Sequence, residues 1–155
     1  MTAMINKCEE VYAWLYHYVD SEQRARSIAT SGLMLPSAPD LENFVEDETL
    51  SRQRVNFTDV LPEEGRELIS ANTSVSVHNI NYCLELLVPA KRLVQRIDFE
   101  PRCYQIYSKE PVRVIVLRYW NMDKVERWTK KYGYKINRYF NGNLIPQAEW
   151  TKTKV

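Results

Sequence analysis

Glycine and histidine are scarce in this chain of 155 residues, and their scarcity excludes several familiar enzyme classes. There are four glycines and two histidines, His17 and His78. The glycines are too few and too scattered for a phosphate-binding loop, and neither a P-loop nor a G-x-G-x-x-G pattern is present. The G-x-S-x-G elbow of the hydrolases is also missing. Neither histidine belongs to an H-E-x-x-H pattern, so we expect no metal site.

Cysteine, net charge and long apolar runs are also limited. Three cysteines, Cys8, Cys83 and Cys103, match no zinc-binding spacing and favour a reduced, intracellular protein. The net charge of +1 argues against strong non-specific attraction to nucleic acid but leaves room for a local patch. Residues 1–10 do not resemble a signal peptide, and no apolar run is long enough to span a membrane. We expect a cytoplasmic protein without membrane association, or one delivered into a target cell without a signal peptide.

The chain is nevertheless rich in large rings, with ten tyrosines and four tryptophans. Such rings fill cores more often than they bind ligands, but they also stack on nucleotide bases. The length fits a single domain over residues 1–155, and an apolar content of 45% is ordinary for a globular protein.

The order of expected elements indicates an α+β domain. The first helix has Asp20 as its expected N-cap, with Gln23 three residues later as in a capping box, and it ends at Gly32. Residues 70–76 are polar and predict a loop. The predicted strands are 11–19, 55–58, 81–88, 104–107 and 112–120, the predicted helices follow residue 20 and cover 63–70 and 122–131, and a hairpin-like turn falls at 140–143.

The first strand carries a histidine at an unusual place. Side chains alternate between the two faces of a strand, so His17 shares its face with Ala13, Leu15 and Val19. The opposite face holds four large rings. Those rings, Tyr12, Trp14, Tyr16 and Tyr18, are therefore expected to brace the sheet rather than surround the histidine.

Several segments together resemble the ADP-ribosyltransferase superfamily, and more narrowly its small HYD-signature toxin family. Residues 15–19 read LYHYV, a helix follows, and residues 31–37 read SGLMLPS. The family has Leu-Tyr-His-Tyr-Thr, a helix and Ser-Gly-x-x-x-Pro-Ser. Residues 56–59 (NFTD) and 82–88 (YCLELLV) are similar to later family segments, and 110–114 (EPVRV) looks like a strand of the rifampin ADP-ribosyltransferases. The resemblance covers residues 14–120 and implies a split β-sandwich with a few flanking helices.

The resemblance also implies an activity. Such domains bind NAD+ as a substrate in a cleft between two small sheets, and they transfer ADP-ribose from it or hydrolyse it. The strand histidine, here His17, hydrogen-bonds a ribose, and a neutral imidazole can donate such a bond. Tyr18, Asn56, Phe57 and Thr58 would line the NAD+ site. The acceptor is left open as a protein, a nucleic acid or a small molecule, and the setting would be a toxin, an effector or a conflict system with a cognate inhibitor protein.

Catalysis would need a carboxylate. Cleaving the glycosidic bond of NAD+ builds positive charge on the ribose, and a carboxylate in a dry site stabilises it. Asp98 follows the strand at 81–88 much as an aspartate does in the rifampin enzymes, and Glu149 lies in a Gln-x-Glu pattern typical of arginine-modifying members. Glu100 and Glu110 are further candidates.

One departure keeps other functions open. Asn56 stands where the family carries tyrosine, and an amide cannot stack as a phenol ring does, although Phe57 beside it could. An inactive relative that binds a nucleotide or a protein is therefore the main alternative, and a plain interaction module is the third. Among local alternatives, Thr58 and Asp59 could cap the helix at Glu63 or form a turn. Asp98 could pair with Arg96 or Arg102, and residues 130–135 could contact nucleic acid or simply be solvated.

Overall fold

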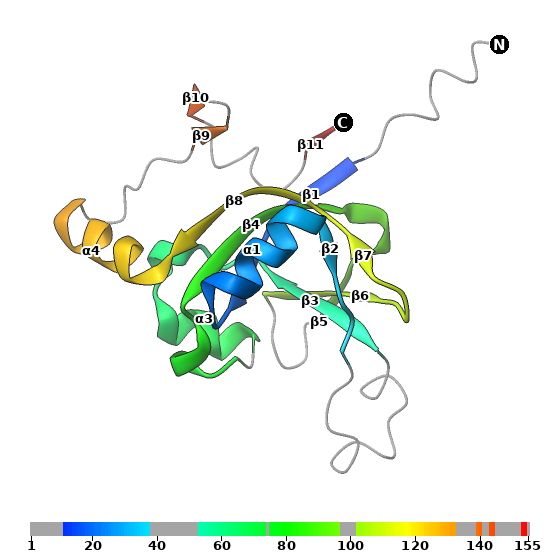
Figure 1. Cartoon of the computed structure of the whole chain (residues 1–155), viewed down its shortest axis with the longest axis horizontal. Helices are drawn as coiled ribbons and strands as arrows, with labels where there is room; N and C mark the ends of the chain where they lie inside the picture. The colour runs from blue at the N-terminus through cyan, green and yellow to red at the C-terminus, as the bar shows by residue number, and fades with distance from the viewer. Residues whose placement is uncertain are drawn as a thin grey trace.

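A central antiparallel sheet forms the frame of the molecule in the computed structural model (Figure 1). The structure describes residues 11–37, 53–73, 75–96 and 102–132, together with three short strands near the C-terminus. The elements in chain order are β1 (Val11–Val19), α1 (Glu22–Ser31), β2 (Leu33–Met34), β3 (Arg54–Thr58), η3 (Pro62–Glu64), α3 (Arg66–Thr73), η4 (Val77–Asn79), β4 (Tyr82–Pro89), η5 (Ala90–Arg92), β5 (Val94–Arg96), β6 (Cys103–Tyr107), β7 (Val112–Arg113), β8 (Ile115–Asn121), α4 (Met122–Tyr132), β9 (Tyr139–Phe140), β10 (Asn143–Leu144) and β11 (Thr153–Lys154).

The strand order in the sheet is β5-β6-β3-β1-β4-β8, and β11 also pairs with β1. The longest ladder joins β1 and β4, from Tyr12 opposite Pro89 to Val19 opposite Tyr82. Two small antiparallel pairs, β2 with β7 and β9 with β10, lie outside this sheet. The predicted α+β class is therefore confirmed, and the pairing of β9 with β10 agrees with the hairpin turn predicted at residues 140–143.

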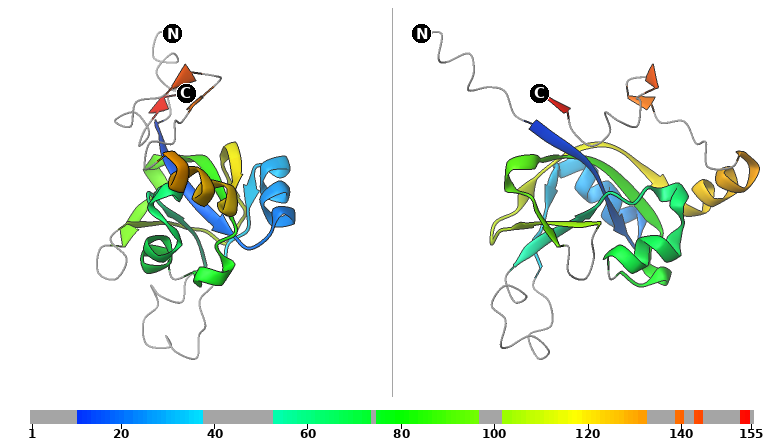
Figure 2. Two further views of the ribbon diagram at one scale, coloured as in Figure 1. Left: turned by 90° about the vertical axis from the view of Figure 1, so that its left-hand side faces the viewer. Right: turned by 180° about the vertical axis from the view of Figure 1, so that it is seen from behind.

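Each face of the sheet carries its own apolar core, as the alternation in β1 predicted. Helix α1 covers the face with His17, and α3 lies on the other side (Figure 2). The core under α1 includes Leu15, Val19, Ala25, Phe57, Leu84, Leu86 and Ile106. The core on the opposite face includes Trp14, Tyr16, Tyr18, Ile69, Ile80, Cys83 and Met122. The tyrosines of β1 therefore brace the sheet, and Cys83 is a core residue.

Helix α1 begins one residue later than predicted. Ser21, not Asp20, is the N-cap, because its backbone is extended and its hydroxyl accepts from the Arg24 amide at 3.2 Å. Asp20 instead forms an ion pair with the Arg24 side chain. The predicted end at Gly32 is confirmed, since Gly32 is left-handed with φ of 68° and donates to the Ile28 carbonyl.

Two further predictions were wrong in part. Helix α3 continues to Thr73, into the segment expected as a loop, and the Asn72 and Thr73 side chains donate to carbonyls of the preceding turn. The strand expected at 112–120 is broken at Val114, whose amide donates to the Gly32 carbonyl. β7 consequently pairs with β2, whereas β8 joins the central sheet. Within the described part of the chain, no helix is long and apolar enough to cross a membrane.

Candidate functional site

The sheet opens between β1 and β3, and His17 lies at the opening. These two strands share one register pair, Tyr16 opposite Thr58, although β3 extends back to Arg54. Just beyond that pair, the His17 side chain reaches across to β3, and its Nδ1 lies 2.8 Å from the backbone oxygen of Asn56. An imidazole therefore takes the place of a backbone ladder bond at the point where the two strands separate.

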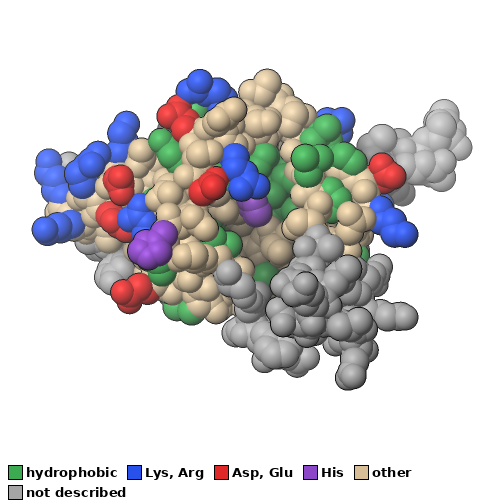
Figure 3. All heavy atoms as spheres, turned by 60° about the horizontal axis from the view of Figure 1, so that its bottom comes forward, with side chains coloured by type: hydrophobic (Ala, Val, Ile, Leu, Met, Phe, Trp, Pro, Cys, Tyr) green, Lys and Arg blue, Asp and Glu red, His purple; other side chains and the backbone are tan. Residues whose placement is uncertain are grey.

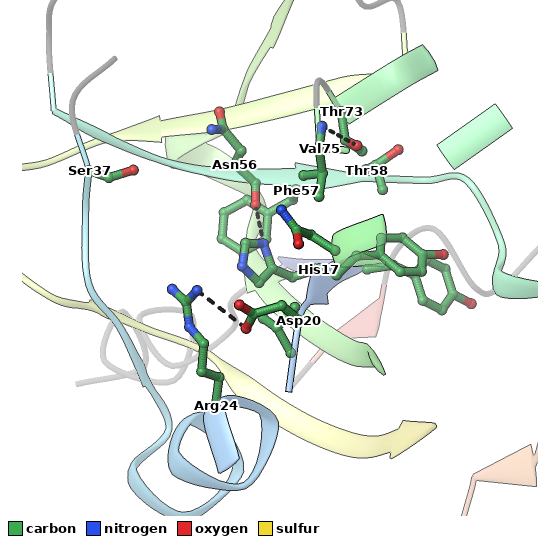
Figure 4. Close-up of a pocket in the computed structure, with 13 residues that line it drawn as sticks. His17, Asp20, Arg24, Ser37, Asn56, Phe57, Thr58, Thr73 and Val75 are labelled. Carbon is green, nitrogen blue, oxygen red and sulfur yellow. Dashed lines mark hydrogen bonds and ion pairs between the residues drawn. The ribbon is translucent and has the colours of Figure 1, made fainter. Parts of the chain in front are cut away.

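Two adjoining cavities flank this opening. Their volumes are about 280 and 290 Å³, and both are lined by His17, Val19, Arg24, Ser37 and Asn56. The first extends towards α3 and η4, where Thr58, Thr73 and Asn79 line it; the second extends towards α1 and β2. The apolar part of the second wall consists of Ile28, Leu33, Met34, Leu35 and Val55. Together they form a two-lobed cleft, which is seen as a hollow in the face drawn in Figure 3; Figure 4 shows the residues that line the first cavity.

His17 is neutral and has a defined tautomer. A carbonyl oxygen can only accept, so Nδ1 donates its proton to Asn56 and Nε2 keeps its lone pair. Desolvation by burial lowers the pKa of His17 to about 4, although the bond to Asn56 opposes this and the Arg24 charge adds slightly to it. At neutral pH, Nε2 can therefore accept a hydrogen bond from a hydroxyl. The sequence had suggested the opposite direction, with His17 as donor.

Arg24 and Asp20 lie together at the cleft. In Figure 4 both side chains extend towards His17, Arg24 from α1 and Asp20 from the turn before it. Their charged atoms are 3.5 Å apart, and the side chains are 68% and 45% exposed. Such an exposed pair contributes little to stability, so Arg24 is available for an anionic ligand. Arg24 was not among the predicted site residues, although its position in the first turn after the His17 strand was a usable signal.

Asn56 and Phe57 support His17 rather than offering an open stacking surface. The Asn56 amide oxygen accepts from Gln105 at 2.8 Å, and the Gln105 oxygen accepts from the Tyr107 hydroxyl at 3.0 Å. Phe57 is 1% exposed and meets the His17 ring at a centroid distance of 6.4 Å and an angle of 62°. The phenyl ring therefore forms the floor beneath the imidazole.

Tyr18 and Thr58 line the cleft with polar groups that are already engaged. The Tyr18 hydroxyl donates to the Val60 carbonyl at 2.6 Å. The Thr58 hydroxyl donates to the Arg102 carbonyl at 2.8 Å and accepts from the Val60 amide. Asp59 next to Thr58 forms an ion pair with Arg102. These residues hold the turn after β3 and shape the cavity wall.

The predicted catalytic acids are not brought to this cleft by the described structure. Asp98, Glu100 and Glu149 lie outside the described residues. Glu110 is exposed in the turn before β7 and lines neither cavity. Among the described residues that line the cleft, Asp20 supplies the carboxylate. No group of three or more His, Cys, Asp or Glu residues able to hold a metal occurs in the described ranges.

The chain matches no known family model, no curated protein and no solved structure. Its function is therefore inferred from the residues and geometry of the cleft.

Proposed function

We propose that this chain is an ADP-ribosyltransferase-like domain that binds NAD+ in the two-lobed cleft and cleaves its nicotinamide–ribose bond. The observation that carries the proposal is a neutral histidine inserted where two strands of one sheet separate. This is the position at which a split β-sandwich of that superfamily would hold a ribose. The proposed settings are those of a toxin, an effector or a conflict-system protein, with ADP-ribose passing to an acceptor or to water.

The segments behind the resemblance meet at this one cleft. His17 comes from LYHYV, Ser37 from SGLMLPS and Asn56 from NFTD, and all three line both cavities. They are separated by up to 39 positions in the chain. The pairing of β1 with β3 and the bridge from Ser37 to Arg54 bring these segments together, and their meeting at one cleft supports the proposal.

The chemistry of the cleft also suits a dinucleotide. Arg24 lines both cavities, and its guanidinium can bind a diphosphate through paired hydrogen bonds. His17 Nε2 is a hydrogen-bond acceptor for a ribose hydroxyl. The apolar wall formed by Ile28, Leu33 and Met34 fits a base ring. Arg24, a cation that lines both lobes, thus matches a ligand with a nucleoside at each end and a negatively charged diphosphate between them.

The proposed reaction breaks the bond between the ribose C1′ and the nicotinamide nitrogen, whose electron pair leaves with nicotinamide. A nucleophile on the acceptor, or water, then forms the new bond at C1′ and gives its proton to a carboxylate. Asp98 and Glu149 remain the proposed carboxylates, because their positions in the sequence are similar to those of acids in related enzymes. The variants Asp98→Asn and Glu149→Gln replace each carboxylate by its amide and test that assignment.

The second candidate is an inactive relative that binds a nucleotide or a protein through the same cleft. Asn56 occupies the tyrosine position of the family, and its amide is held by Gln105. The phenol and phenyl rings that line the cleft, Tyr16, Tyr18 and Phe57, are 1%, 4% and 1% exposed. The described lining therefore offers nicotinamide little open aromatic surface, which favours binding without cleavage.

The experiment compares NAD+ binding with nicotinamide release in matched variants. Thermal stability with and without NAD+ reports binding, and chromatography reports nicotinamide. We expect His17→Ala to fold, to weaken NAD+ binding about tenfold, the loss of roughly one hydrogen bond, and to abolish cleavage. Arg24→Gln should weaken binding similarly. Arg26→Gln is the control, since Arg26 makes an equivalent i,i+4 pair with Glu22 on α1 but lines neither cavity of the cleft.

The outcomes separate the candidates. Nicotinamide release that survives in His17→Ala would contradict the site assignment. Binding of NAD+ by the wild-type protein without release supports the inactive relative. A wild-type protein that NAD+ does not stabilise contradicts NAD+ binding under either candidate and favours the interaction module.

A further inference from the structure

Helix α4 carries exposed cations on the side that faces away from the core. Met122 and Val125 are 0% and 2% exposed and pack inwards. Lys124, Arg127 and Lys130 are exposed. None of these three side chains forms an ion pair or hydrogen bond within the part of the chain that the structure describes. Figure 3 shows Lys and Arg side chains gathered at the left end of the molecule, over α4.

The two acidic residues of the same helix are both paired with one arginine. Asp123 and Glu126 both form ion pairs with Arg66, which also donates to the Ile80 carbonyl at 2.8 Å. This network anchors α4 to the body of the molecule, and the single positive charge of Arg66 offsets one of the two carboxylates, so the three cations outnumber the one negative charge that remains. The helix dipole accounts for a cation such as Lys130 in the last turn, but Lys124 and Arg127 lie before that turn.

A partly exposed ring lies beside these cations. Trp128 is 37% exposed and is held edge-on against Trp120, with ring centroids 5.7 Å apart and an interplanar angle of 85°. Its place in the chain is next to Arg127, and it lies one helical turn after Lys124. We define the basic face of α4 as Lys124, Arg127, Trp128 and Lys130.

We propose that the basic face of α4 binds single-stranded nucleic acid. Unpaired cations along one helix can follow a phosphate backbone, since Lys124 and Lys130 are separated by about 9 Å along the helix axis. An exposed indole adds a surface on which a base can stack, and this combination is the usual means of binding single strands. The proposal concerns a surface distinct from the cleft and stands whether or not the cleft binds NAD+.

The apolar content of α4 argues against a membrane as the partner. A helix that lies on a membrane needs a continuous exposed apolar face. Here Met122 and Val125 are buried in the molecule, which leaves Trp128 as the exposed large apolar side chain of the described helix. Cations without such a face favour a soluble polyanion.

The test is fluorescence anisotropy with labelled single-stranded DNA and RNA of about 16 nucleotides, at several salt concentrations. The variant is K124Q/R127Q/K130Q. The control, K91Q/R92Q/K109Q, removes three exposed cations elsewhere and changes the net charge equally. We expect the α4 variant to bind at least tenfold more weakly than the control. Its salt slope should also be lower by about 2, because three phosphate contacts are lost.

Three results would overturn the proposal. The first is absence of wild-type binding to either oligonucleotide, and the second is an equal loss in both triple variants, which would show a general charge effect. The third is equally tight binding of poly-glutamate, which would show an acidic protein surface as the fitting partner. These measurements use no NAD+, so their failure is distinguishable from failure of the proposed function.

A second pair of variants tests the stacking part. Trp128→Leu keeps an apolar contact with Trp120 but removes the ring, whereas Trp128→Phe keeps a ring. We expect the leucine variant to lose at least about fivefold in affinity and the phenylalanine variant to lose less, with helix content unchanged by circular dichroism. Equal affinity of the leucine variant and the wild-type protein would contradict stacking.

Discussion

At the scale of single residues, the state of His17 decides what the cleft can bind. Its Nδ1 is held by a backbone carbonyl, and burial keeps the ring neutral. The free nitrogen is therefore an acceptor. Protonation would turn that nitrogen into a donor and place a charge beside Arg24, which also carries a positive charge.

This state predicts an unusual pH dependence of NAD+ binding. Because the pKa of His17 is about 4, the affinity should stay constant as the pH falls from about 8 to about 5 and should drop only as the pH passes the pKa. An ordinary surface histidine would change the affinity near pH 6.5. Isothermal titration at a series of pH values measures the profile, with His78→Ala as a control that should leave it unchanged. A midpoint near 6.5 for the wild-type protein would contradict the neutral-acceptor role.

The candidate site was only partly predictable from its residues. His17 stood out because a histidine in an apolar and aromatic strand needs a polar partner. The partner itself, a backbone carbonyl of Asn56, has no sequence signature. Arg24 escaped notice because exposed arginines are ordinary on helices, and the commitment of the Asn56 amide to Gln105 depends on the register between β3 and β6.

At the scale of elements, local chemistry predicted some boundaries well and others poorly. β1 was predicted with its observed bounds, since β-branched and aromatic residues fill all of it. The polar end of α3 was missed because Asn72 and Thr73 satisfy their side chains on their own helix. The break at Val114 was missed because its cause is tertiary, a hydrogen bond to Gly32.

Gly32 offers a test of how that junction is built. Its φ of 68° disfavours any side chain, and an added Cβ would lie 3.3 Å from the Val114 carbonyl oxygen. We expect Gly32→Ala to lower the free energy of unfolding by about 1–2 kcal/mol, measured by urea denaturation. Thr30→Ala, at an exposed position of α1, is the control and should change it by no more than about 0.5 kcal/mol. A Gly32→Ala protein as stable as the control would show that the junction relaxes without strain.

At the scale of the whole molecule, the two faces of the sheet hold a carboxylate and an imidazole whose pKa values burial shifts in opposite directions. On the face with the aromatic core, Glu85 is 0% exposed, accepts from the Trp120 indole at 2.5 Å and lies 3.4 Å from Arg118. Burial raises the pKa of Glu85 to about 7 in spite of Arg118 and the tryptophans. On the other face, burial lowers the pKa of His17 to about 4.

The two groups should therefore oppose each other in the pH dependence of folding. Between the ordinary value of 4.5 and about 7, the folded state keeps a proton on Glu85 that the unfolded chain releases, so stability falls as the pH rises. Between about 4 and 6.5, the unfolded chain holds a proton on His17 that the folded state lacks, so stability rises with pH. In the window that they share, the two slopes partly cancel.

Glu85→Gln should expose the His17 slope, because the amide can still accept from Trp120 but no longer titrates. Relative to the wild-type protein, we expect the variant to gain stability progressively as the pH rises from 4.5 through 7, by on the order of 3 kcal/mol in total. His17→Gln should do the reverse and gain relative stability as the pH falls from 6.5 towards 4. Urea denaturation across this range gives both difference curves, in which other titrating groups cancel. Parallel curves for the wild-type protein and both variants would show that burial does not hold either group in its neutral form. The neutral His17 acceptor, on which NAD+ binding is proposed to depend, would then be contradicted as well.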